Sequence, residues 1–157
     1  MGGQGDENLI AYCGLYCGDC HGYQGKIPDL ARDLRKALRA AQYAKFAALL
    51  AEQGWSKIFE HYDHCYELLG AMMKFRCKIG CRQGGGPPYC KIRHCCQKKE
   101  LAGCWQCEEF ETCENLEFLR HVHGDAHLRN LRTLKRNGAA EFLTGKHDWY
   151  HAEQVKK

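Results

Sequence analysis

Twelve of the 157 residues are cysteine, and their spacing constrains this chain more than any other feature. Eleven fall into two groups, C-x3-C-x2-C near the start and C-x3-C-x8-C-x4-C-C-x7-C-x2-C-x5-C in the second half. These eleven are Cys13, Cys17, Cys20, Cys77, Cys81, Cys90, Cys95, Cys96, Cys104, Cys107 and Cys113. Two or three residues between thiols let one tight turn present both sulfurs to the same metal ion. We therefore expect the eleven cysteines to be metal ligands.

The composition and the N-terminal residues also favour metal binding by the cysteines. Hydrophobic residues make up 45% of the chain, but that figure includes the cysteines, so the apolar core is thin for this length. The first nine residues are polar and glycine-rich, with no signal peptide, and we expect a cytoplasmic protein whose reduced cysteines favour metals over disulfides. No apolar run is long enough to cross a bilayer, so we expect no membrane partner.

The remaining sequence predicts a mainly α protein with one domain over residues 1–157. Apolar residues such as Leu30, Leu34 and Leu38 recur at helical spacing, and Asn137-Gly138 is a typical helix stop. The expected order is a cysteine knot at 12–23, a helical hairpin at 28–75, cysteine-rich irregular loops at 77–113 and C-terminal helices at 114–144. We expect the loops to be stapled by metal.

The identity of the metal stays open between zinc and iron–sulfur. Two or three zinc ions suit the surplus of ligands and the C-x2-C spacing of Cys104 and Cys107. The C-x3-C-x2-C of the first group resembles the motif that holds a [4Fe–4S] cluster in radical S-adenosylmethionine enzymes, so a cluster at Cys13, Cys17 and Cys20 is the alternative. The large barrel of those enzymes does not fit into 157 residues of mainly helical pattern.

The first group supplies three ligands, and both kinds of centre usually need four. We expect the fourth to be a thiolate from residues 77–113, since a helical hairpin brings the chain back to its start. The alternative is an open three-cysteine site with water or a small molecule in the fourth place, which would favour catalysis.

One cysteine and three histidines have simpler interpretations. Cys65 stands alone in an apolar helical stretch, and we expect it to be buried and unligated. His121, His123 and His127 form H-x-H-G-D-x-H. This pattern fits either a metal or acid–base site with Asp125 or polar caps around a helix junction, and we prefer the caps.

The basic residues between Arg82 and Lys99 have no acidic residue among them. We do not expect them to bind nucleic acid, because aromatic residues are sparse there and the net charge of +4 is mild. Arg93 lies between Cys90 and Cys95, where it is either a charge partner for the metal site or a solvated side chain.

Several spaced motifs resemble one known family. They are Y-C-G-L-Y-C-G-D-C at 12–20, C-K-I-R-H-C at 90–95 and C-W-Q-C-E-E-F-E-T-C at 104–113. Together they resemble the bacterial and archaeal family called domain of unknown function 3795, from about Ala11 to Phe142. The resemblance implies a small soluble protein, frequent in anaerobes, that binds metal through these cysteines and has no assigned reaction. The chain departs from the family at His21, often proline, at the three-residue spacing of its central pair, and at the extra Cys96.

From these patterns we predict a cysteine-rich metal-binding protein, with sites at least partly structural, that acts through a protein partner. The alternative is a [4Fe–4S] electron-transfer protein or an accessory subunit of an anaerobic redox enzyme. A small metalloenzyme with an open site or a reactive thiol such as Cys96, and a nucleic-acid binder, rank lower.

Overall fold

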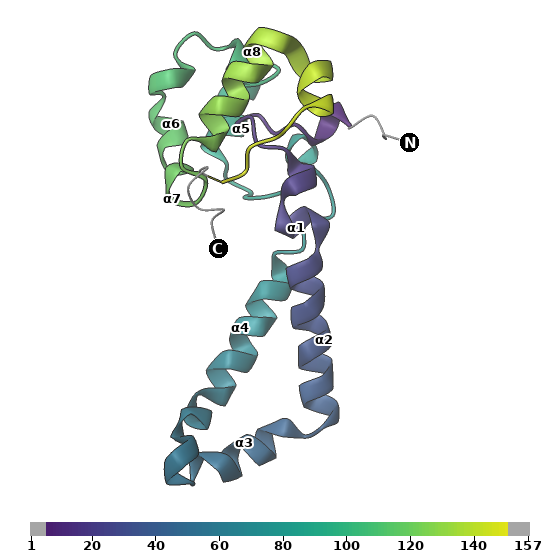
Figure 1. Cartoon of the computed structure of the whole chain (residues 1–157), viewed down its shortest axis with the longest axis vertical. Coiled ribbons are helices and arrows are strands. Elements are labelled where there is room, and N and C mark those ends of the chain that lie inside the picture. The colour runs from purple at the N-terminus through teal and green to yellow at the C-terminus, as the bar shows by residue number, and fades with distance from the viewer. Residues whose placement is uncertain (1–5, 151–157) are drawn as a thin grey trace. The chain divides into compact units, whose positions relative to one another are not determined.

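Helices dominate the computed structural model, which describes residues 6–150 (Figure 1). The mainly α prediction is confirmed, since the described residues contain no β-strand and only an isolated bridge between Ile10 and Tyr16. The α-helices are α1 (His21–Gln24), α2 (Lys26–Ala40), α3 (Tyr43–Ala51), α4 (Tyr62–Lys74), α5 (Lys91–Lys98), α6 (Glu114–Glu117), α7 (Arg120–His123) and α8 (Ala126–Thr144). The 3₁₀ helices are Glu7–Leu9, Cys17–Asp19, Gly54–His61, Cys81–Gln83, Cys104–Gln106 and Phe110–Thr112.

The chain divides into two compact units. The hairpin unit is Gln24–Cys77, and the cysteine unit takes the residues up to Tyr23 and from Lys78 onward. Ten of the eleven expected ligands thus belong to the cysteine unit, while Cys77 ends the hairpin unit. The single domain stays a prediction.

The hairpin unit is built from α2 and α4, which lie side by side, with α3 across their far ends (Figure 1). Arginine side chains of α2 contact the aromatic side chain of Tyr66 on α4. The Arg35 guanidinium lies 4.2 Å from the centre of the Tyr66 ring, and Arg39 donates to the Tyr66 hydroxyl at 3.3 Å. The hairpin expected at 28–75 is therefore present, and it begins at Lys26.

This unit leaves most of its large apolar side chains in solvent. The exposed ones are Ile27, Leu30, Leu34, Phe46, Leu49, Trp55, Ile58, Leu68, Met72 and Phe75. Ala31 and Ala47, by contrast, are its buried hydrophobic residues among those described. Two packed helices have no third layer to cover their outer faces, so the apolar spacing that predicts the hairpin does not produce a closed core.

The burial expected for Cys65 is wrong, because Cys65 is exposed on α4. The half-buried face of α4 carries Tyr62, Tyr66, Leu69 and Met73, which recur at helical spacing. Cys65 precedes Tyr66 by one position and is therefore turned about 100° away from that face.

The cysteine unit has a core of its own. Leu15, Ile92, Phe110, Leu116, Leu119, Leu128 and Leu131 form it together with Cys96 and Cys104. The N-terminal loop enters this core at Gly14, whose φ is 83°, and a Cβ there would lie 2.8 Å from the Leu131 side chain. The amide of Cys104 donates to the carbonyl of Tyr12 at 2.8 Å, which fixes the loop against the second cysteine group.

The C-terminal helix α8 is interrupted at the position where the sequence predicts a helix end. Within α8, Gly138 has a φ of 79° and a ψ of 175°, so the helical conformation is interrupted directly after Asn137. Phe142 lies beyond the break and is buried against Ile10 and Leu134. Along residues 6–150 we find no helix with the length and apolarity that a membrane span requires.

Candidate metal centre

Four expected ligands from three separate segments gather in the cysteine unit, and we call them the first cysteine cluster: Cys13, Cys17, Cys81 and Cys90. The amide of Cys81 donates to the sulfur of Cys17 at 3.5 Å. The pKa of Cys13 is raised to about 12, mainly by burial. A hydrogen bond from the backbone amide of Leu15 lowers this pKa, and the neighbouring thiols of Cys81, Cys90 and Cys17 raise it further. A buried thiol with such neighbours ionises at neutral pH only when a cation compensates the charge.

A buried arginine lies against this cluster. Arg93, on α5, is only 6% exposed and donates to four backbone carbonyls: Cys81 at 3.2 Å, Gly85 at 2.8 Å, Pro87 at 2.9 Å and Pro88 at 3.2 Å. In the described part of the chain, no carboxylate lies within 4.0 Å of its guanidinium. Burial raises the pKa of Cys81, and the Arg93 guanidinium opposes that rise. With no carboxylate nearby, the thiol of Cys81 is an ionisable group on which this buried cation acts.

Arg93 binds the segment that contains the Gly84–Pro88 run of glycines and prolines. Its prolines have no N–H group, and its carbonyls have no regular secondary structure to bond to. The planar guanidinium satisfies three of them at once and holds the loop next to Cys81 and Cys90. Of the two interpretations left open for Arg93, the solvated one is wrong.

Five further expected ligands line one cavity of about 420 Å³, and we call them the second cysteine cluster: Cys95, Cys96, Cys104, Cys107 and Cys113. The buried sulfurs of Cys96 and Cys104 lie 3.6 Å apart. The hydrogen bond between them lowers the pKa of Cys96 and, together with burial, raises that of Cys104.

The two remaining expected ligands are Cys20 and Cys77. Cys20 is half-buried in the cysteine unit, and Cys77 belongs to the hairpin unit. Within residues 6–150, no group of three or more His, Cys, Asp or Glu side chains already has the arrangement of a metal site. The ligand set of eleven cysteines stays a prediction, which the two clusters make more specific.

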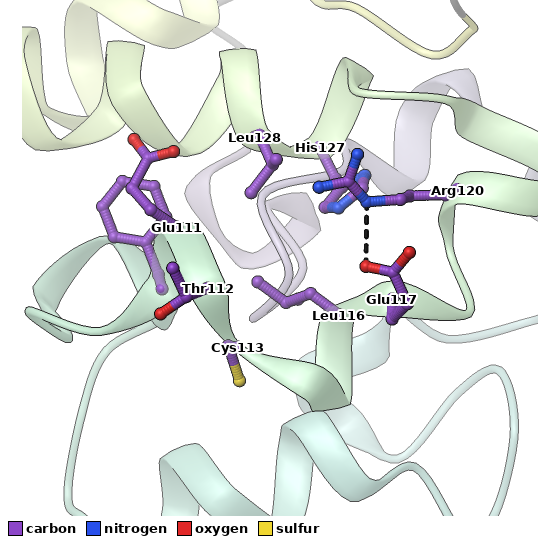
Figure 2. Close-up of a pocket in the computed structure, with 9 residues that line it drawn as sticks. Glu111, Thr112, Cys113, Leu116, Glu117, Arg120, His127 and Leu128 are labelled. Carbon is purple, nitrogen blue, oxygen red and sulfur yellow. Dashed lines mark ion pairs between the residues drawn. The ribbon is translucent and has the colours of Figure 1, made fainter.

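The three histidines of H-x-H-G-D-x-H have different surroundings. Nδ1 of His123 lies 2.7 Å from the carbonyl oxygen of Trp149, and His121 is exposed. His127 is 1% exposed, and neither of its ring nitrogens has a hydrogen-bond partner among the described residues. It lines a second cavity, of about 240 Å³, beside Arg120 (Figure 2).

His127 should make the stability of the cysteine unit depend on pH. Burial, and then the positive charges of Arg120 and His123, lower the pKa of His127 to about 4. The unfolded chain, with a pKa near 6.5, then binds the proton more readily than the folded chain, so stability is complete above that pH and falls as the pH drops toward 4. Between pH 7 and pH 5 we expect a loss of about 2 kcal/mol from this group.

Urea unfolding of the wild type and of His127→Phe at both pH values measures this effect. The variant should lose about 2 kcal/mol less than the wild type over that interval. His121→Gln, which changes an exposed ring, should behave as the wild type does. An equal pH dependence in all three proteins would contradict the assignment.

Substitution of Cys65 should have almost no effect. Because the side chain is exposed and belongs to neither cluster, Cys65→Ser should change the free energy of unfolding by less than about 0.5 kcal/mol. Elemental analysis should find the same metal content as in the wild type. Loss of one metal ion per chain would place Cys65 among the ligands.

Two features of the candidate site could not be predicted from the sequence, namely the division of the cysteines into two clusters and the contacts of Arg93. The spacing identifies the cysteines but not the division into two clusters, which depends on how the N-terminal loop meets Cys81 and Cys104. For Arg93, the one available signal is a run of glycines and prolines whose carbonyls need donors.

Comparison with known proteins is consistent with these motifs. The model of a family described as protein of unknown function (DUF3795) matches residues 9–118. Searches of curated proteins and of solved structures each found no match. The matched segment contains all twelve cysteines, from Cys13 to Cys113, and covers more than half of the chain. The chain therefore belongs to the DUF3795 family of proteins of unknown function.

Proposed function

We propose that this protein is a cytoplasmic, cysteine-rich metal-binding protein whose metal is at least partly structural and which acts through a protein partner. The observation that carries the proposal is the first cysteine cluster beside the buried Arg93. Four thiolates on one divalent ion leave a net charge of about −2. A buried guanidinium that otherwise meets only neutral carbonyls offsets part of this charge.

The donor set fits the proposed metal. Sulfur donors without carboxylates suit zinc or an iron–sulfur cluster rather than magnesium or calcium. Ligands from three segments of one unit would tie the N-terminal loop to Cys81 and to the start of α5. Two of the four proposed ligands, Cys81 and Cys90, then come from the 77–113 region, whereas the sequence predicts Cys20 as the third ligand and takes only the fourth from that region.

Zinc is the metal we favour, and a [4Fe–4S] cluster is the alternative. Single zinc ions need sulfurs that approach one another closely, and two sulfurs of the second cysteine cluster do so at 3.6 Å. The [4Fe–4S] alternative uses Cys13, Cys17 and Cys20, and it would make the protein an electron carrier or an accessory subunit of an anaerobic redox enzyme.

The hairpin unit supports the second half of the proposal, the protein partner. Ten large apolar side chains are exposed on it, with Trp55 82% and Phe75 77% exposed. Apolar surface of this extent, bordered by charged residues such as Arg32 and Asp33, is typical of a protein-interaction site.

Elemental analysis of the full chain, purified without oxygen, tests the proposal. We expect a colourless protein with at least one zinc ion per chain, and Cys17→Ser should lower that content while Cys65→Ser should not. A brown protein with iron and sulfide would establish the alternative. A protein that folds with neither metal would overturn both.

A further inference from the structure

We propose that the cavity of the second cysteine cluster binds a separate zinc ion through Cys96, Cys104, Cys107 and Cys113. This inference rests on the proposed function and adds a second, independent centre with its own ligands. The cavity lies between α5, the 3₁₀ turn Cys104–Gln106 and the segment that leads into α6. Three chain segments therefore contribute thiols to one space.

The spacing of the buried pair favours a single ion. A zinc–sulfur bond of about 2.3 Å and a tetrahedral angle place two sulfurs on the same ion about 3.8 Å apart. The sulfurs of Cys96 and Cys104 lie 3.6 Å apart, close to that value. Ligands of a [4Fe–4S] cluster bind different iron atoms, so their sulfurs lie farther apart.

The third ligand comes from the turn that contains Cys104. The amide of Cys107 donates to the carbonyl of Cys104 at 2.9 Å, which closes the C-x2-C turn. This turn is the usual way in which one short segment offers two thiolates to zinc. Both residues line the cavity.

The fourth ligand that we assign is Cys113, and the direction of its side chain supports the assignment. Cys113 borders both cavities of the cysteine unit. Figure 2 shows its sulfur pointing away from His127 and Arg120, which border the smaller cavity. The thiol is therefore available to the five-cysteine cavity, and His127 is not part of the same centre.

Two nearby cations and the rotational freedom of the cysteine side chains also support zinc binding in this cavity. Lys99 borders the cavity, and Arg82 lies close enough to act on Cys96. These two cations offset part of the negative charge of four thiolates. Because the sulfurs within the described residues do not yet meet at one point, binding requires rotation of cysteine side chains about χ1, which has three accessible staggered positions.

Cys95 provides the matched control. It borders the same cavity but precedes Cys96 on α5, so its side chain leaves the helix about 100° away. It is half-buried, whereas Cys96 is 2% exposed. We assign Cys96, not Cys95, as the ligand from α5.

The test measures zinc per chain in full-length wild type, Cys107→Ser, Cys95→Ser and Cys17→Ser, all purified without oxygen. Cys107→Ser should lose one zinc ion and keep the metal of the first cluster, and Cys95→Ser should keep both. Cys17→Ser should lose the other metal and keep this zinc. X-ray absorption at the zinc edge of the wild type should give four sulfur neighbours, and it needs no variant to fold.

The outcomes separate the two proposals. A wild type without metal overturns the proposed function. A wild type whose metal is lost in Cys17→Ser but unchanged in Cys107→Ser overturns the second centre alone. Loss of zinc in Cys95→Ser, or fewer than four sulfur neighbours at zinc, overturns the ligand set.

Discussion

Removal of the metal that we propose should unfold or loosen the cysteine unit, and this is the largest effect we expect. A structural zinc site contributes about 10–16 kcal/mol of apparent binding free energy at neutral pH. The whole stability of a domain is about 5–15 kcal/mol. The segments that meet at the two clusters consist of short turns and helices of four to eight residues, such as Cys81–Gln83 and α5. Such segments do not hold their shape without tertiary contacts.

Hydrogen exchange before and after treatment with a strong chelator measures this effect residue by residue. The amides of Ile92 and Leu131, in the core of the cysteine unit, should lose most of their protection. Re-addition of zinc should restore it, which excludes damage by the chelator. Unchanged exchange and unchanged thermal unfolding after verified metal loss would contradict a structural role.

Local sequence signals predict the helical framework well. The hairpin and the break in α8 follow from short-range features, namely apolar spacing and the Asn137-Gly138 stop. Burial is harder to predict, as Cys65 shows. Its apolar neighbours suggest a core position, but two helices without a third layer leave that side of α4 in solvent.

The grouping of the cysteines depends on long-range contacts that spacing does not encode. Cys17 meets Cys81 across 64 positions of the sequence, and Cys104 meets Tyr12 through a backbone hydrogen bond. A C-x2-C or C-x3-C pattern predicts that its own two thiols are close, and it carries no information about which other turn they approach. The membership of the two clusters is therefore a product of tertiary packing.

Replacement of Arg93 by methionine should destabilise the cysteine unit by about 3 kcal/mol or more. The substitution leaves the buried carbonyl of Gly85 without a donor, which costs about 1–3 kcal/mol, and removes the partly buried bonds to Pro87 and Pro88, each worth about 0.5–1.5 kcal/mol. It also removes the buried cation next to Cys81, so the proposed metal should bind more weakly. Urea unfolding and zinc content measure the two effects separately, with the exposed Lys91→Met on the same helix as the control.

Arg93→Lys separates the charge from the hydrogen bonds. A lysine ammonium keeps the positive charge but lacks the planar fork that reaches Gly85, Pro87 and Pro88 together. If Arg93 acts as counter-charge to bound thiolates, Arg93→Lys should retain most of the zinc that Arg93→Met loses, while both variants lose stability. Equal loss of zinc in the two variants would assign Arg93 to holding the loop alone. Full zinc content in Arg93→Met would contradict its electrostatic role, because the thiolate charge would then be balanced without it.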